Sequence, residues 1–110
     1  MNAFDVLGDP IRRSILDLLA EGELTAGEIV DSVQKTFEVT QPAVSHHLRV
    51  LRESGFAGVR RDGTRRLYSL RPDAFHEADE WLERFRRRWT GPLEALATEV
   101  ARGKKERNQR

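Results

Sequence analysis

The sequence predicts a mostly α-helical domain with one small β-hairpin. Apolar residues recur at helical spacing before Gly55 and again after Pro72, and between these stretches the pattern becomes roughly alternating. A further observation is Asp62-Gly63, which lies between two alternating runs and is a strong local signal for a hairpin. Two helices that are followed by a helix with a polar face and then by a hairpin have the order of a winged helix-turn-helix.

Length and composition exclude several classes of protein. The chain has 110 residues and no cysteine, which fits one small domain without a disulfide scaffold, a zinc ribbon or a cysteine nucleophile. No apolar run approaches the roughly 18 residues of a membrane span, and the first residues lack the basic and apolar regions of a secretory signal. We therefore expect a cytoplasmic protein with no membrane contact. A domain of this size has little room for an enclosed active site, which favours binding over catalysis.

Charge is unevenly distributed, although the formal net charge is only +1. Residues 1–39 carry 3 basic and 8 acidic side chains, whereas residues 40–71 carry 7 arginines against 2 acidic side chains. The segment 102–110 is basic and has no apolar residue. We predict a folded domain over 1–101 followed by a disordered tail over 102–110. The middle segment and the tail can present positive surface to a polyanion; solvated arginines on an ordinary surface are the alternative.

The first two predicted helices are marked by glycine and by a capping residue. A short helix is predicted to end at Gly8. A longer helix begins after Asp9, with Pro10 in its first turn, and stops at Gly22. Four aliphatic residues at helical spacing form its predicted buried face: Ile11, Ile15, Leu18 and Leu19.

A third helix is predicted to begin at a capping box. Thr25 is followed three residues later by Glu28, a spacing that allows each side chain to bond the other residue's backbone N–H group. Ile29 and Val33 then form the buried stripe. The end of this helix is predicted within 34–38.

The most informative segment is a helix predicted over 41–54. Thr40 is a candidate N-cap, Pro42 lies in the first turn, and Gly55 is a C-terminal signal. The inward stripe is aliphatic: Val44, Leu48 and Leu51. The outward faces carry polar side chains: Gln41, Ser45, His46, Arg49 and Arg52. A helix that enters the major groove of double-stranded DNA needs such side chains, because they read base edges or bind phosphates.

The alternating runs predict a hairpin over 57–70 with an arginine-rich tip. If the turn is centred on Asp62-Gly63, one set of side chains forms the inner face: Ala57, Val59, Tyr68 and Leu70. Four arginines are then predicted to crowd the outer face and the tip: Arg60, Arg61, Arg65 and Arg66. Like charges this close repel one another unless a polyanion lies alongside, so we expect them to bind DNA phosphates or a narrow minor groove.

From Pro72 the helical spacing returns and predicts a long helix. Its apolar stripe consists of Phe75, Ala78, Leu82, Phe85 and Trp89. A two-layer domain has little room to bury all of this stripe. A homodimer interface made by the same helix of two chains is our preferred interpretation, and burial against its own domain is the alternative. A break at 90–92 and a short helix over 93–100 are predicted to follow.

Over about residues 4–71 the sequence resembles the ArsR family of bacterial winged-helix transcriptional repressors. The resemblance lies in three stretches: DPIRRSILDLLAEGELTAGEI, TQPAVSHHLRVLRESGF and VRRDGTRRLYSL. It implies a dimer joined by its terminal helices, a recognition helix at 41–54 and a wing at 57–70. A dimer with a two-fold axis is expected to bind an inverted repeat. The resemblance therefore implies a repressor that binds an operator in double-stranded DNA, with an effector that the sequence does not identify.

The sequence departs from the family's metal sensors in one segment. Thr25 and Gly27 stand where ELTAGEI resembles the segment that carries the sensors' cysteine pair. His76 lies near three acidic residues, but no second histidine is suitably spaced. The acidic residues are Asp79, Glu80 and Glu83. We therefore predict no metal and no cofactor, and a repressor that responds to metal through a non-cysteine site is an alternative. A second departure is the connection 29–40, about four residues longer than the family's usual spacing, which bears on how the recognition helix is seated.

No group of residues has the spacing of a catalytic site. His46 and His47 are neighbours on a helix and point about 100° apart, so they are badly placed to chelate one ion. His47 is expected to be a structural, hydrogen-bonded residue. No nucleophile, base and orienting acid occur at motif spacing, and no glycine-rich loop could cradle a nucleotide. The remaining alternative class is a winged helix that contacts other proteins, against which the polar helix and the arginines weigh.

Overall fold

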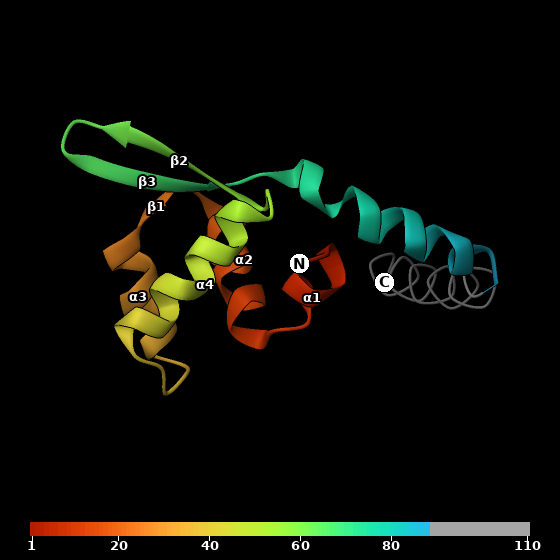
Figure 1. Cartoon of the computed structure of the whole chain (residues 1–110), viewed down its shortest axis with the longest axis horizontal. Helices are drawn as coiled ribbons and strands as arrows, with labels where there is room; N and C mark the ends of the chain where they lie inside the picture. Colours follow the sequence, from red (N-terminus) through yellow and green to blue (C-terminus); the bar gives the residue numbers. More distant parts are fainter. Residues whose placement is uncertain (89–110) are drawn as a thin grey trace, which may run out of the picture. The chain divides into compact units, whose positions relative to one another are not determined.

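A computed structural model of the chain describes residues 1–88. The helices are α1 (Ala3–Leu7), α2 (Pro10–Glu21), α3 (Ala26–Gln34) and α4 (Gln41–Glu53), and the strands are β1 (Leu24–Thr25), β2 (Ala57–Asp62) and β3 (Arg65–Leu70) (Figure 1). A 3-10 turn, η1 (Pro72–Phe75), leads into a helix over 76–88. This arrangement confirms the predicted fold class. Strand β1 was not predicted from the sequence.

The chain divides into two compact units, Met1–Ala78 and Asp79–Arg110. The first unit holds the helices α1 to α4 and the sheet. Several predictions fall on residues outside the described part of the chain: Trp89, the break at 90–92, the helix over 93–100 and the tail over 102–110. No helix within residues 1–88 is long and apolar enough to cross a membrane.

The helix N-termini form where capping side chains satisfy the first backbone N–H groups. The Asp9 carboxylate accepts hydrogen bonds from two N–H groups in the first turn of α2, at 2.8 and 3.1 Å. Thr25 and Glu28 form the predicted capping box of α3, and the Thr40 hydroxyl caps α4. These contacts confirm the predicted helix starts, because each cap satisfies a donor that the helix itself cannot. Helix α3 ends at Gln34, within the predicted interval.

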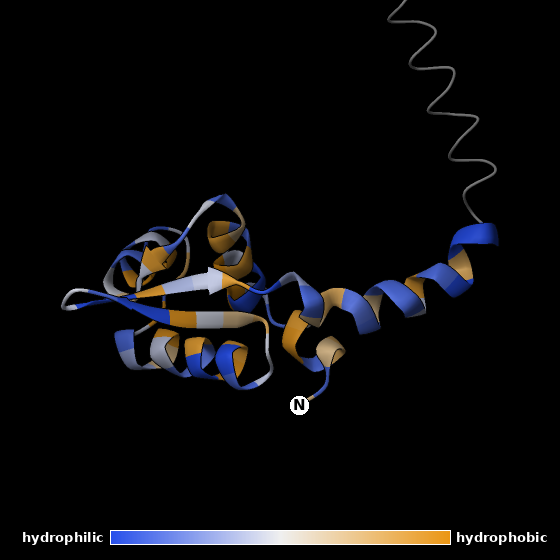
Figure 2. Ribbon diagram, turned by 90° about the horizontal axis from the view of Figure 1, so that it is seen from above, coloured by the Kyte–Doolittle hydropathy of each residue, from blue (hydrophilic) through white to orange (hydrophobic). Residues whose placement is uncertain are grey.

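The core of the first unit lies among the helices and beneath the base of the sheet. Figure 2 shows apolar residues along one side of each helix and a hairpin whose tip is hydrophilic. The largest fully buried side chains are Phe56, Ile15, Ile29, Leu51, Val6, Val33 and Val44. Helix α4 packs against α2, α3 and β2, and its predicted inward stripe is buried. One side of α4 is thereby fixed in the core and the other is left to solvent.

The buried face of α2 differs from the predicted face. The buried residues are Arg12, Ile15, Leu16 and Leu19, whereas Ile11 and Leu18 are only half-buried. All four predicted residues lie in the core or pack against it, but the prediction missed Arg12 and Leu16 on the buried face. The guanidinium group of Arg12 bonds backbone carbonyls at the end of α1.

The sheet has the order β1-β3-β2, with both pairs antiparallel. A two-residue turn joins β2 to β3, and Gly63 in this turn adopts a φ of 66°, which favours glycine. The turn lies one residue later than the predicted centre. The predicted inner face is otherwise correct, because Ala57 lies opposite Leu70 and Val59 opposite Tyr68.

The four arginines of the hairpin do not share one face, so that prediction is wrong. Side chains that lie directly opposite each other in an antiparallel pair project to the same side of a sheet, and the side alternates along each strand. Arg61 lies opposite Arg66, on the same face as Val59. Arg60 and Arg65 project to the other face, since Arg60 lies opposite Leu67 and Arg65 opposite Asp62.

The apolar stripe of the C-terminal segment is divided between burial and exposure. Phe75 is half-buried, and its ring meets the ring of Phe56 edge to face with the centroids 5.0 Å apart. Ala78 is buried as well. Leu82 and Phe85 remain exposed at 38% and 40%. The segment also begins as a 3-10 turn and becomes α-helical only at residue 76.

Candidate nucleic-acid interface

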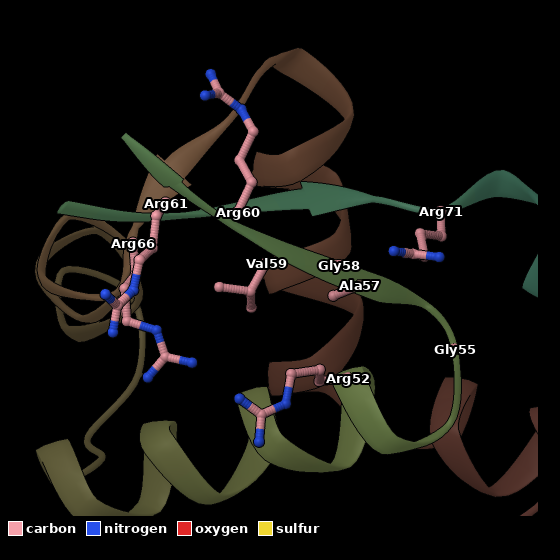
Figure 3. Close-up of a pocket in the computed structure, with 9 residues that line it drawn as sticks. All are labelled: Arg52, Gly55, Ala57, Gly58, Val59, Arg60, Arg61, Arg66 and Arg71. Atoms are coloured by element: carbon pink, nitrogen blue, oxygen red, sulfur yellow. The ribbon is translucent and has the colours of Figure 1, made fainter. Parts of the chain in front are cut away.

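An open trough lies between the outward face of α4 and one face of the hairpin. Two adjoining cavities of about 520 and 390 Å³ form it, and Arg52 lines both. From α4 the trough is lined by Pro42, Ser45, His46, Arg49 and Arg52. From the hairpin and its flanks it is lined by Gly55, Ala57, Gly58, Val59, Arg60, Arg61, Arg66, Tyr68 and Arg71. Although Arg60 lines the larger cavity, its side chain extends to the other side of the hairpin from those of Arg61 and Arg66 (Figure 3). Figure 3 shows the guanidinium groups of Arg52, Arg61 and Arg66 in the space between helix and hairpin.

The α4 side of the trough presents hydrogen-bonding groups in a row. Ser45, His46 and Arg49 are exposed, and a guanidinium nitrogen of Arg49 lies 3.4 Å from Nδ1 of His46. Gln41 is exposed in the first turn of the same helix but does not line either cavity. Because the opposite stripe of α4 is buried, these side chains are held outward.

The hairpin side of the trough is cationic. Arg61 and Arg66 face each other across the two strands, and both approach the cavity that Arg52 lines from α4. Within residues 1–88, none of these three guanidinium groups pairs with a carboxylate, and the residues that line the trough include no acid. Three unneutralised cations around one open cavity favour the binding of a polyanion.

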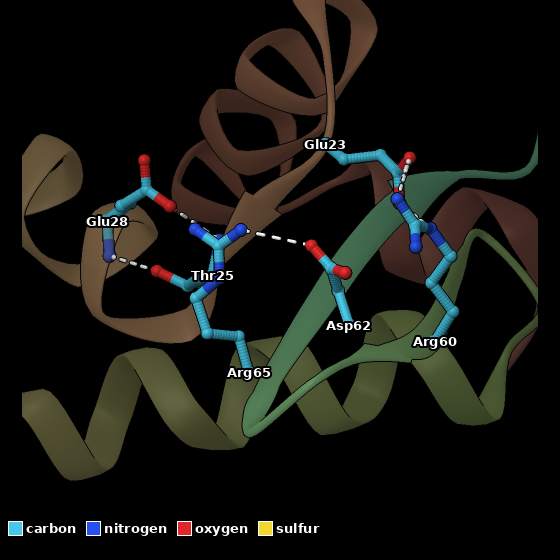
Figure 4. Close-up of polar contacts among 6 residues, drawn as sticks. All are labelled: Glu23, Thr25, Glu28, Arg60, Asp62 and Arg65. Atoms are coloured by element: carbon cyan, nitrogen blue, oxygen red, sulfur yellow. Dashed lines mark hydrogen bonds and ion pairs between the residues drawn. The ribbon is translucent and has the colours of Figure 1, made fainter.

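The opposite face of the hairpin is neutralised by the chain itself. Nε and Nη2 of Arg60 donate to the two carboxylate oxygens of Glu23 at 2.7 and 3.1 Å, and Nη2 of Arg65 lies 3.0 Å from a carboxylate oxygen of Asp62 (Figure 4). Glu28 belongs to this neighbourhood. Hydrogen bonds from Thr25 hold the pKa of Glu28 below its ordinary value, and the charge of Arg65 contributes to the shift. We call the face of the hairpin that carries Arg60, Asp62 and Arg65 the back face.

Behind α4 lies a buried arginine that the sequence analysis did not identify as important. Nε of Arg12 donates to the Val6 carbonyl at 3.0 Å and Nη2 to the Asp5 carbonyl at 2.8 Å. Nη1 lies 3.2 Å from Nδ1 of His47 on α4. This contact confirms that His47 is structural and hydrogen-bonded. Because a guanidinium group only donates, the Nδ1 atom accepts and carries no proton.

The pKa of His47 is lowered by its surroundings. Burial is the largest cause, and the charge of Arg12 lowers the pKa further against the opposing effect of Asp9. The pKa of the Asp9 carboxyl group is lowered too, although burial acts on it in the opposite direction. Burial would raise its pKa, but backbone N–H groups of Arg12 and Ile11 and the nearby positive charge lower it. In the cluster of Asp9, Arg12 and His47, the imidazole of His47 is therefore favoured in its neutral form.

Sequence reasoning missed two polar side chains that line the trough, those of Tyr68 and Arg71. Tyr68 was predicted for the inner face of the hairpin but not as a candidate contact. Arg71 lies just beyond β3, and its guanidinium group covers Gly58, where an added Cβ would lie 2.5 Å from Nε. The alternation of the strands could have indicated Tyr68, which is two residues from Arg66. Nothing local marks Arg71, because its position depends on the close approach at Gly58.

No metal site was found in the part of the chain that the structure describes. Within residues 1–88, no three histidine, aspartate or glutamate side chains are grouped so that they could hold an ion. Thr25 is occupied in the capping box, and Gly27 is exposed.

Comparison with known proteins identifies relatives that are described as transcriptional regulators. Residues 9–58 match the model of the family described as "Bacterial regulatory protein, arsR family". The chain is 36% identical over 84 residues to the transcriptional repressor SdpR of Bacillus subtilis, covering 76% of this chain and 89% of that protein. It is 38% identical over 95 residues to the HTH-type transcriptional regulator Rv2034 of Mycobacterium tuberculosis, covering 86% and 82%.

Solved structures show the same similarity. One described as a possible transcriptional regulator for arsenical resistance has a TM-score of 0.65 at 30% identity, with 90% of this chain and 96% of the other covered. NolR from Sinorhizobium fredii has a TM-score of 0.59 at 28% identity, with coverage of 74% and 78%. The shared fold extends over most of each chain.

Proposed function

This chain belongs to the arsR family of bacterial regulatory proteins and is therefore a DNA-binding transcriptional regulator and not an enzyme; we propose that it is a dimeric repressor that binds an inverted repeat through α4 and the trough. The observation that carries this proposal is the trough itself. A polar helix face and unneutralised arginines meet there, and no acidic side chain lines it. A winged helix that served only protein contacts would be expected to expose apolar anchors at this place.

The two walls of the trough are suited to two kinds of DNA contact. Gln41, Ser45 and His46 lie at the start and on the outer side of α4, where a helix that enters the major groove meets base edges. Guanidinium groups bind phosphates well because their donors match the geometry of the oxygens. We assign phosphate binding to four arginines of the trough: Arg49, Arg52, Arg61 and Arg66. Arg60 and Arg65, which the sequence also suggested as DNA contacts, are occupied by carboxylates on the back face.

The dimer is proposed on the exposed part of the C-terminal stripe. Leu82 and Phe85 are exposed large apolar side chains, and the ring of Trp81 lies 4.7 Å from that of Phe85 between centroids. Exposed apolar groups on one helix are stabilised when the same helix of a second chain covers them. Phe75 is half-buried and Ala78 is buried within the first unit, so these two predicted interface residues are less available to a second chain.

The division of DNA contacts is tested by comparing Gln41→Ala with Arg66→Ala. DNA sites are first selected from random fragments with the native protein, and binding to selected and random DNA is then measured at several salt concentrations. Gln41→Ala is expected to cost about 1 to 3 kcal/mol on selected DNA only. Arg66→Ala should weaken both DNAs and lower the salt slope by about one unit for each protomer.

The reverse pattern would show that the two walls have been assigned to the wrong DNA contacts. That pattern would be an equal loss on both DNAs for Gln41→Ala, or a sequence-selective loss for Arg66→Ala with an unchanged slope. Failure of the native protein to select any DNA would overturn the repressor proposal as a whole.

The dimer is tested by the double substitution of Leu82 and Phe85 by glutamate. Each glutamate would place a charge in an apolar contact, so the variant should be monomeric. The molar mass in solution is measured by light scattering for the native chain and the variant. An unchanged mass of two chains would place the interface elsewhere.

A further inference from the structure

An ion pair on the back face joins the two outer strands of the sheet. Arg60 belongs to β2, and Glu23 immediately precedes β1, while β3 lies between these strands. Arg60 lies opposite Leu67, and Leu67 lies opposite Thr25, so the three residues form one row across the sheet. The side chain of Arg60 therefore passes across the middle strand to reach both carboxylate oxygens of Glu23. The guanidinium group is held by two bonds, which fixes its direction as well as its distance.

The base of the hairpin packs against α2, α3 and α4, but its outer part has few contacts that could fix its direction. Strand β1 pairs with only two residues of β3, Tyr68 and Leu67. Beyond this pairing, all of the residues 61–66 are exposed, and they carry the arginines that face the trough. A two-stranded ribbon without further packing is only marginally stable, and its twist varies readily. Arg60 lies in the last row where β1 still pairs with the ribbon, and Glu23 lies just before β1.

We propose that Glu23 and Arg60 are positioning residues that set the direction of the hairpin against α4, and that Arg60 does not bind DNA. This inference rests on the proposed function, since it concerns how Arg61 and Arg66 are held at the trough. Two observations support it together. Although Arg60 lines the larger cavity, strand alternation directs its side chain to the face opposite Arg61 and Arg66. Its guanidinium group also has a carboxylate partner already.

The positioning role predicts that Glu23→Gln changes DNA affinity in the direction opposite to the usual effect of charge. Loss of a negative charge from a DNA-binding protein ordinarily strengthens its attraction to DNA. If Arg60 were a phosphate contact that Glu23 merely occupies, Glu23→Gln would release it and tighten binding. If the pair positions the hairpin, Glu23→Gln weakens binding even though the protein becomes more positive.

The chain offers a matched control for this charge effect. Glu21 is exposed at the end of α2, two residues before Glu23, and makes no hydrogen bond or ion pair among the described residues. Binding of selected DNA by Glu21→Gln and Glu23→Gln is compared with the native chain at several salt concentrations. We expect binding by Glu23→Gln to be weaker by about two- to fivefold for each protomer, the range of an exposed ion pair. Glu21→Gln should bind as well as the native chain or slightly better.

The exchanged pair, Glu23→Arg with Arg60→Glu, completes the binding experiment. It keeps the net charge and allows an ion pair of reversed direction, so it should recover most of the loss seen in Glu23→Gln. The salt slope of Arg60→Gln should equal that of Glu23→Gln, because both variants break the same pair, whereas Arg61→Gln should lower the native slope by about one unit for each protomer. Tighter binding by Glu23→Gln, or a slope for Arg60→Gln lower than that of Glu23→Gln, would overturn the positioning role.

The position of the hairpin is measured without DNA as well. The chain has no cysteine, so spin labels can be attached to single cysteines introduced at Asp31 on α3 and at Thr64 in the turn. Labelled chains are mixed with excess unlabelled chains, and the distance distribution is recorded by electron paramagnetic resonance. It should broaden in Glu23→Gln and stay narrow in Glu21→Gln.

The two sets of measurements separate this inference from the proposed function. An unchanged distance distribution in Glu23→Gln overturns the positioning role even if DNA binding follows the proposed division of contacts. If instead Arg61→Gln leaves the salt slope unchanged while the distribution in Glu23→Gln broadens, the positioning role holds and the assignment of the trough to DNA fails.

Discussion

Helix α4 separates two regions where arginine is used in opposite ways. On its outer side, Arg52, Arg61 and Arg66 surround an open trough, and no carboxylate partner is present among residues 1–88. On its inner side, Arg12 is only 9% exposed, and its three guanidinium nitrogens each have a partner. The same type of side chain thus holds the protein together behind the helix and is left available in front of it.

The difference between the two regions lies in what each arginine satisfies. The bonds of Arg12 to two carbonyls provide partners for groups at the end of α1 that the short helix cannot satisfy itself. The side chains of Arg52, Arg61 and Arg66 have no partner among residues 1–88, so their donors remain for a ligand. Substitutions behind α4 should therefore change stability, and substitutions in front should change DNA binding.

The largest expected effect is on the stability of Arg12→Met. The variant would leave the buried Val6 carbonyl and the partly buried Asp5 carbonyl without this donor, and we expect the free energy of unfolding to fall by about 3 kcal/mol. Urea denaturation measures the change. Arg13→Met is the matched control, because Arg13 also bonds a carbonyl of α1 but at an exposed position where water can replace it. Equal losses in the two variants would show that the burial of Arg12 is not what matters.

A smaller effect, on binding alone, is expected for Arg52→Gln. This arginine lines both cavities of the trough, so its loss should lower the salt slope of DNA binding by about 0.9 for each protomer. The urea midpoint should stay at the native value, in contrast to Arg12→Met. Lys35→Gln removes the same charge from an exposed position outside the trough and should leave the slope unchanged. A shifted urea midpoint for Arg52→Gln would show that Arg52 contributes to stability as well, and would contradict the distinction between the two sides of α4.

The smallest effect is a dependence of stability on pH through His47. The pKa of His47 in the folded chain is below its ordinary value of 6.5, so the unfolded chain binds a proton more readily. Stability is therefore complete above about pH 6.5 and declines as the pH falls from there towards the folded pKa. The decline should stay below about 1 kcal/mol, since solvent screens a partly exposed group.

Urea denaturation between pH 7.5 and pH 5.5 tests the contribution of His47 against His47→Gln. The variant should lose less stability over this range than the native chain does. The lowered pKa of Asp9 also makes the chain less stable as the pH falls, but only below about its ordinary pKa of 3.8. That pH is outside the measured range. The groups that face the imidazole, Asp9, Arg12 and His46, are retained in both proteins. Parallel curves for the two proteins would show that the contact with Arg12 does not depend on a neutral His47.

The sequence by itself determined the features that depend on neighbours along the chain. Capping side chains mark the starts of α2, α3 and α4 because they bond N–H groups only two or three residues away. The inward stripe of α4 follows from helical spacing, and once that stripe is buried the outward position of Ser45, His46 and Arg49 is settled. The hairpin likewise follows from two alternating runs and a glycine at the turn.

The tertiary structure decided which arginines are available, because that depends on groups that are distant in the sequence. Arg60 lies beside Glu23, which is 37 residues away in the chain, and Arg12 lies beside His47, which is 35 residues away. Spacing along α2 did not reveal that Arg12 faces inward, since only the carbonyls of α1 make that position favourable for a charged group. Arg71 reaches the trough only because Gly58 leaves room for its guanidinium group. A local pattern gives the direction of a side chain relative to its own helix or strand, but the partner that neutralises its charge is brought there by the fold.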